Sequence, residues 1–136
     1  MARLPRLRDA SPSMLVLEGF WVESLSYAES EDPDEEIEPS LKISRPELMQ
    51  RVDDPAVYRA RIRCVISHGQ ERKLDLVMSS EFRLSGDALD SPAAFLEVNA
   101  PSILLGVMRG VVATVTSLTR GGRMDLPSVN LAATFE

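Results

Sequence analysis

The sequence contains few of the side chains on which enzymes most often rely. Its 136 residues include one histidine, His68, and one cysteine, Cys64. A serine–histidine–acid arrangement would depend on that single histidine, which lies at a predicted turn, and no cysteine–histidine cluster has metal-site spacing. Neither a phosphate-binding glycine loop nor a dinucleotide fingerprint is present. These absences predict a protein that is not an enzyme and that uses no cofactor and no metal.

The cysteine count and the charge also limit where the protein acts and what it binds. With Cys64 as the only cysteine, no internal disulfide is possible, which is typical of a reducing compartment. The formal net charge of −6 argues against nucleic acid as the main partner. The apolar run at residues 14–17 is too short for the core of a signal peptide. We therefore expect a cytoplasmic protein.

The chain length is that of one domain. Residues 1–13, which are basic and contain proline, are expected to form a flexible N-terminal arm, and residues 14–136 a single domain. The acidic run at residues 29–38 is interrupted by proline and is predicted to be a solvated connection. A second interpretation is an acidic docking surface for a basic partner. That surface would comprise Glu31, Asp32, Asp34, Glu35 and Glu36.

Residues 101–120 form the most apolar stretch of the chain and are predicted to be one long helix. Pro101 suits a first helical turn, Asn99 can cap it, and Gly121 and Gly122 can end it. A bilayer helix of this length is conceivable, but the internal Arg109, the glycines and the lack of aromatic anchors disfavour it. We expect a sheet on one side of the helix and another subunit on the other. The predicted oligomer interface is an apolar seam made of Leu104, Met108, Val111, Val115 and Leu118.

Alternating apolar and polar residues predict four strands before this helix. They lie near residues 14–29, 41–44, 57–67 and 73–85. In the third, Ile62 and Cys64 share one face and Arg61 and Arg63 the other. The acids of the fourth strand suit cross-strand pairing with these arginines. Consecutive strands and one long helix predict an α+β fold, with an antiparallel sheet packed on the helix.

Apolar side chains also gather on segments that look like connections. One interpretation is contact between subunits. The other is a groove that accepts extended apolar segments of another chain. From the residues alone the two are evenly matched. The candidate groove comprises Leu41, Ile43, Leu48, Met49, Leu89, Phe95 and Leu96.

The run from Asn99 to Phe135 resembles the SecB family of export chaperones. In that family a Pro-(Asn/Ser)-Ile-Leu start leads into a long helix that ends in a Ser-Arg-Gly patch. A Leu-x-Pro-hydrophobic-Asn tail follows. The matching positions here are Pro101, Ile103, Leu104, Arg109, Thr116, Arg120, Gly121, Leu126, Pro127, Val129, Asn130 and Phe135. Looser similarity extends upstream to about residue 20.

The resemblance implies a four-stranded antiparallel sheet backed by the helix and assembled as a dimer of dimers, a homotetramer. It also implies an ATP-independent holdase that binds unfolded or nascent polypeptides, with client grooves at residues 41–49 and 89–96. The further partner would be the export motor SecA, docked on the acidic run, or an antitoxin client. Nucleic acid and membrane insertion are not expected. The alternative from a different class is a structural oligomerisation or adaptor subunit that binds one fixed, folded partner.

Overall fold

The computed structural model describes residues 14–29, 39–68 and 72–126. The predictions made for the N-terminal arm, the acidic run, the turn after His68 and the C-terminal tail lie outside these residues. The described chain consists of five strands, one 3-10 helix and one long helix. Their bounds are β1 Leu15–Glu29, β2 Pro39–Ile43, β3 Glu47–Gln50, β4 Val57–His68, β5 Arg72–Leu84, η1 Gly86–Leu89 and α1 Pro92–Ser117.

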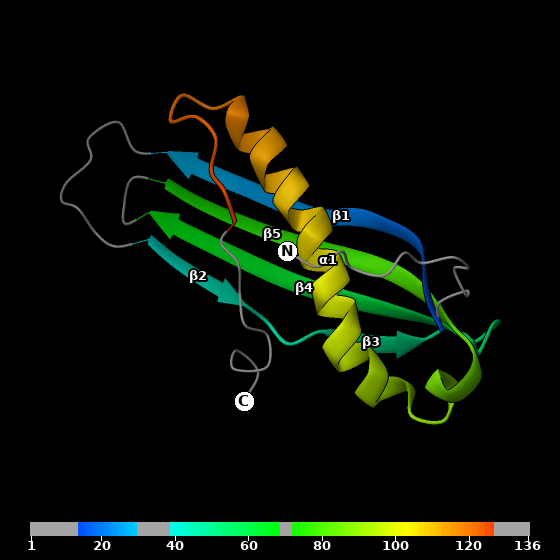
Figure 1. Cartoon of the computed structure of the whole chain (residues 1–136). Coiled ribbons are helices and arrows are strands. Elements are labelled where there is room, and N and C mark those ends of the chain that lie inside the picture. The colour runs from blue at the N-terminus through cyan, green and yellow to red at the C-terminus, as the bar shows by residue number, and fades with distance from the viewer. Residues whose placement is uncertain (1–13, 30–38, 69–71, 127–136) are drawn as a thin grey trace, which may run out of the picture.

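The strands form one antiparallel sheet in the order β1-β5-β4-β2. Strand β3 also pairs with β4, on the same side as β2 but nearer the N-terminal end of β4. Strands β2 and β3 together therefore make one edge of the sheet, interrupted at residues 44–46 (Figure 1). Pro46 lies in this interruption, where its missing N–H leaves no gap in the ladder. The predicted α+β fold, an antiparallel sheet packed on one C-terminal helix, is confirmed; the structure adds one short strand that was not predicted, β3, after the strand predicted near residues 41–44.

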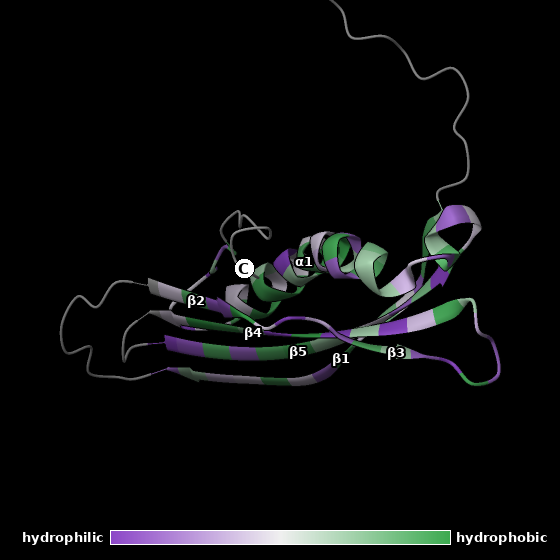
Figure 2. Cartoon of the chain, turned by 90° about the horizontal axis from the view of Figure 1, so that it is seen from below, coloured by the Kyte–Doolittle hydropathy of each residue, from purple (hydrophilic) through white to green (hydrophobic). Residues whose placement is uncertain are grey.

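The alternation predicted for the two central strands is also confirmed. Ile62 pairs with Met78 and Cys64 with Leu76, and all four are fully buried. Arg61 on β4 lies on the opposite, solvated face. Figure 2 shows the consequence: α1 covers one face of the sheet, and no described element covers the other. We call these the helix face and the open face.

The long helix begins at Pro92 rather than at Pro101. Pro101 is inside it and buried, and the Asn99 side-chain amide donates to the Phe95 carbonyl at 2.7 Å instead of capping the first turn. The predicted helix start was therefore wrong. Leu96 and Ala100 are fully buried, so the extra turns are stabilised by packing on the sheet despite the internal proline.

Two apolar clusters join the helix to the sheet. The larger contains Leu104, Met108 and Val112 of α1, packed with the helix-face residues of β4 and β5 and with Met124. The smaller joins the first turns of α1 to the N-terminal end of β1 and the C-terminal end of β5. By length and composition alone α1 is long and apolar enough to cross a membrane. Here one side of it is packed on the sheet (Figure 2).

Arg72 ties the end of the helix to the sheet. Its Nε donates to the Tyr27 hydroxyl at 2.7 Å and its Nη2 to Thr119 Oγ1 at 3.1 Å. The same guanidinium donates to the carbonyls of Gly121 and Gly122 at 3.2 and 2.5 Å. The helix itself ends at Ser117, before the predicted Arg120, and Gly122 has a φ of 79° that favours glycine.

Candidate peptide-binding surface

The seam predicted as an oligomer interface lies mostly inside the single chain. Leu104 and Met108 are fully buried in the larger core cluster, and Val111 packs against it half-buried. Val115 is also half-buried, whereas Leu118 follows the end of the helix and is exposed. Leu104 and Met108 therefore cannot contact a second subunit, and their assignment to an interface was wrong. The most apolar side of a helix is the side that its own sheet covers.

The residues of the predicted groove are distributed over several places. Leu41 and Ile43 are half-buried against the larger cluster, and Leu48 and Phe95 against the smaller one. Leu96 is fully buried and cannot line an accessible groove, so its assignment was wrong.

The other two groove residues are accessible but separate. Met49 pairs with Arg59, which places it on the open face, opposite Leu48. It is exposed, as is Leu89 in η1. The described structure thus does not bring the seven predicted residues into one groove. The five acidic residues of the predicted docking surface lie outside the described part of the chain.

An exposed apolar area does lie on the helix face, along β1. Phe20 pairs with Ser80 and Val22 with Met78, two residues that are fully buried, yet Phe20 is 51% and Val22 44% exposed. The helix crosses the sheet diagonally, from β3 to the C-terminal end of β1, and leaves the first part of β1 without a helix above it (Figure 1). These two side chains are therefore accessible although they lie on the core side of the sheet.

The helix also carries partly accessible apolar side chains. Val107 packs half-buried against the larger cluster together with Leu25 of β1. Ile103 lies one turn earlier on the same side of the helix and remains 37% exposed. We name Phe20 and Val22 the uncovered strip. It offers apolar contact to an added chain without any rearrangement of the core.

Two irregularities in β1 create this strip. The register with β5 shifts between Leu17 and Gly19 and again between Val22 and Ser24. Each extra residue moves the following side chains to the other face. Trp21 has the same parity in the sequence as Leu25 and Tyr27, yet it pairs with Ser79 on the open face, whereas they lie on the helix face. Sequence alternation shows both parities of residues 14–29 to be apolar, but it does not locate the shifts.

The backbone of β1 adds a second element of recognition. Within the described residues β1 pairs only with β5, so its other side is a sheet edge. An edge strand presents unpaired N–H and C=O groups to which an extended chain can bind. Apolar burial on the strip and strand addition at β1 would act on the same segment of an extended polypeptide.

The described residues carry little that would support catalysis or metal binding. No group of three histidine, cysteine or acidic side chains among residues 14–29, 39–68 and 72–126 is arranged to hold a metal ion. Burial raises the pKa of Cys64 to about 11, and a protonated, buried thiol is a poor nucleophile. The accessible chemistry of the helix face is therefore apolar contact and backbone hydrogen bonding.

The fold matches that of a known chaperone structure. No family profile and no curated protein sequence matches this chain. Among solved structures, the Mycobacterium tuberculosis Rv1957 SecB-like chaperone, in complex with a ChAD peptide from the Rv1956 HigA1 antitoxin, superposes with a TM-score of 0.66 at 12% identity. The match covers 86% of this chain and 91% of that chain. The protein therefore has a SecB-like fold.

A second structure has a similar arrangement. A protein of unknown function from Streptococcus agalactiae matches with a TM-score of 0.58 and 19% identity, over 84% of this chain and 97% of that chain. Both identities are low, so the likeness concerns the fold.

Proposed function

We propose that the protein is an ATP-independent holdase that binds unfolded polypeptide segments along β1. The observation that carries this proposal is the uncovered strip, whose Phe20 and Val22 are about half exposed on the core side of the sheet. A client segment would bury apolar side chains there and pair its backbone with the β1 edge. Neither contribution requires a nucleotide, a cofactor or a catalytic residue.

One structural neighbour supports a peptide client. Rv1957 was solved with a peptide from an antitoxin, and an extended peptide segment fits an apolar strip beside a strand edge. An antitoxin and a secretory precursor are both candidate clients of this protein, and cytoplasmic action suits either. Docking of SecA on residues 31–36 remains a separate proposal because those residues lie outside the described structure.

We also propose a homo-oligomer, a dimer of dimers, but through surfaces other than the predicted seam. The outward side of α1 carries Gly106 and Gly110, and a Cβ atom added at either would meet nothing within 4 Å. Small residues at this spacing allow two helices to approach closely. Gly110→Lys is expected to shift sedimentation toward smaller species while the circular dichroism spectrum stays unchanged. An unchanged sedimentation profile would contradict this interface.

The holdase proposal can be tested by suppression of the aggregation of an unrelated unfolded protein, without ATP and at stoichiometric amounts. Phe20→Ser and Val22→Ser should each weaken suppression, because each removes apolar contact area from the strip. Val52→Ser is the matched control: Val52 is fully exposed but lies in the turn between β3 and β4. It should suppress aggregation like the original protein.

Sedimentation of the same variants separates loss of holding from loss of assembly. Equal suppression by all three variants would show that the uncovered strip is not part of the client site. Failure of the original protein to suppress any aggregation, together with stable capture of one folded partner, would favour the adaptor interpretation.

A further inference from the structure

The open face carries a ladder of arginines, most of which are matched by carboxylates. Arg59 binds Glu81 at 3.0 Å, and Arg83 binds both Glu18 at 2.6 Å and Asp54 at 2.8 Å. These pairs join β4, β5 and β1 across the face that the helix does not cover.

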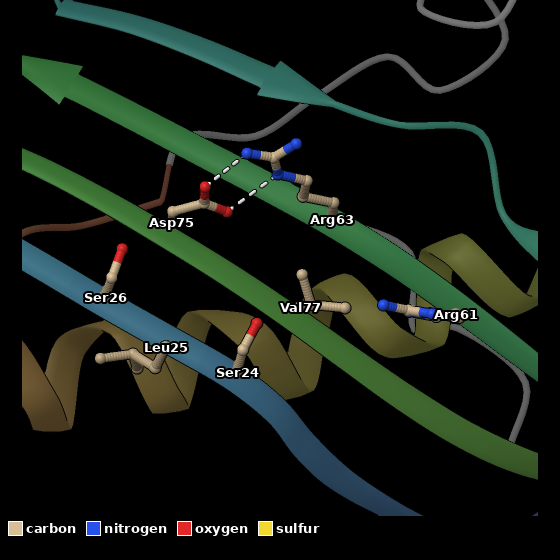
Figure 3. A pocket seen from close by; sticks show the side chains of 7 residues that line it. All are labelled: Ser24, Leu25, Ser26, Arg61, Arg63, Asp75 and Val77. Carbon is tan, nitrogen blue, oxygen red and sulfur yellow. Dashed lines mark hydrogen bonds and ion pairs between the residues drawn. The ribbon is translucent and has the colours of Figure 1, made fainter.

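At one end of the same ladder, Arg63 donates from Nε and Nη2 to the two carboxylate oxygens of Asp75, at 3.0 and 2.5 Å (Figure 3). The hydrogen bonds from Arg63 lower the pKa of the Asp75 carboxyl below its ordinary value. Each of these arginines thus has a carboxylate within hydrogen-bond distance.

Arg61 differs from its neighbours in the ladder. Its cross-strand partner on β5 is Ser79, whereas Arg59 lies opposite Glu81 and Arg63 reaches the neighbouring Asp75 diagonally. Ser79 donates its hydroxyl to Glu23 of β1 at 2.7 Å. The ion pair that the structure gives to Arg61 is with Glu47 at 3.9 Å, and both side chains are well exposed, at 49% and 75%. A pair at this distance and exposure is weak. Glu23 is a second carboxylate near Arg61: the hydrogen bond from Ser79 and, to a smaller extent, the charge of Arg61 lower the pKa of its carboxyl. The Arg61 guanidinium has five N–H donors and can accept a further carboxylate.

Three shallow hollows surround Arg61 and Arg63. The one drawn in Figure 3 has a volume of about 290 Å³ and is also lined by Ser24, Ser26 and Val77. The other two adjoin Arg63 and extend toward the edge strands. Five basic and two acidic side chains line the three hollows together: Lys42, Arg45, Arg61, Arg63 and Lys73, against Glu47 and Asp75. This part of the open face is locally basic, although the whole chain has a net charge of −6.

We propose that this basic area, centred on Arg61, docks an extended acidic segment of a partner protein. Same-face residues of an extended chain repeat every two positions, about 6.6–6.8 Å apart, which is also the spacing of Arg61 and Arg63 on β4. Glutamates at alternate positions of the partner would therefore lie beside the basic side chains that run from Arg61 toward Lys42 and Lys73. The uncovered strip is on the other face of the sheet, so the two surfaces can be occupied together.

The observations favour an acidic polypeptide over nucleic acid. The net charge of −6 opposes the approach of a long polyanion, whereas a short segment feels mainly the local basic side chains within a Debye length. The arginines of this ladder already bind five carboxylates, and the hollows offer the small apolar surface of Val77 beside Arg61. A carboxylate on a flexible side chain suits this geometry.

Fluorescence anisotropy with two labelled nine-residue peptides tests the proposal. One alternates glutamate and serine, and the other has glutamine at each glutamate position. The full chain should bind the glutamate peptide at least tenfold more tightly than the glutamine peptide, and more weakly as salt is raised. Arg61→Gln should lose at least tenfold in affinity for the glutamate peptide. Arg83→Gln, which removes an arginine already paired twice, should stay within about twofold.

Several results would overturn the proposal. Equal affinity for the two peptides, or an unchanged affinity in Arg61→Gln, would show that Arg61 does not bind acidic side chains of the partner. Tighter binding of an oligouridylate of equal charge would assign the area to nucleic acid. A tenfold gain when the acidic residues of 31–36 are replaced by their amides would make the chain's own acidic run the occupant. Phe20→Ser should leave peptide binding unchanged, so failure here and failure of the holdase proposal are distinguishable.

Discussion

The two faces of the sheet are made by the same strands but are held in different ways. On the helix face, Ile62, Cys64 and Met78 pack in a cluster without solvent contact. On the open face, arginines and carboxylates pair in partial contact with water. Apolar burial yields about 25 cal/mol per Å² wherever it occurs, whereas an exposed ion pair contributes about 0–1 kcal/mol. The helix face therefore supplies most of the stability, and the pairs on the open face contribute little to it.

The largest expected effect comes from placing a charge on the helix face. Met108→Asp would bury an unpaired carboxylate in the larger cluster, at a cost of several kcal/mol. This is comparable with the whole stability of a typical domain. Thermal unfolding followed by circular dichroism should show no cooperative transition. Thr114→Asp, an exposed position on the same helix, should unfold nearly as the original does; equal behaviour of the two variants would contradict this account of the core.

Removing the charged group at the margin of the helix face should have the next largest effect on stability. Arg72 is only 11% exposed, and its bonds hold Thr119 and the carbonyls after α1. Arg72→Met leaves those acceptors without a donor and should lower the free energy of unfolding by about 2–3 kcal/mol. Urea unfolding measures this. Lys73→Met, its exposed neighbour on the open face, is the control, and an equally large loss there would contradict the contrast between the faces.

Cys64 reports on the integrity of the helix face without any mutation. Its thiol is fully buried, and burial raises its pKa from 9.0 to about 11. At pH 8 the thiolate fraction alone should slow labelling by on the order of a hundredfold relative to the unfolded chain. Labelling with a disulfide reagent, with and without concentrated guanidinium, measures the ratio. Equal rates would show that this face opens readily.

The smallest effect is expected on the open face itself. The hydrogen bonds from Arg63 lower the pKa of Asp75, so the pair stabilises the fold above the unfolded pKa of about 3.9. That contribution is lost as the pH falls through the lower folded value. Asp75→Asn should therefore be slightly less stable at neutral pH and should converge with the original protein below about pH 4. A constant difference across this range would mean that the change acts through packing.

Much of the fold follows from local patterns. The alternation of β4 and β5 predicts both faces of the sheet, and the long apolar run near Met108 predicts a helix against it. The uncovered strip was harder to predict from the sequence. The two register shifts in β1 turn Phe20 and Val22 toward the helix face, and a shift of one residue leaves no mark in composition. The diagonal path of α1, which leaves those residues uncovered, depends on contacts far apart in the chain.

Local sequence patterns predict most of the elements and their polarity, because side chains two apart on a strand or three and four apart on a helix share one face. Which apolar residues become core and which stay accessible depends on the packing of distant elements. Leu104 and Met108 look as suitable for an interface as for a core, and Pro101 looks like a helix start until Leu96 and Ala100 are packed. Burial depends on what lies opposite, and that neighbour comes from a distant part of the chain.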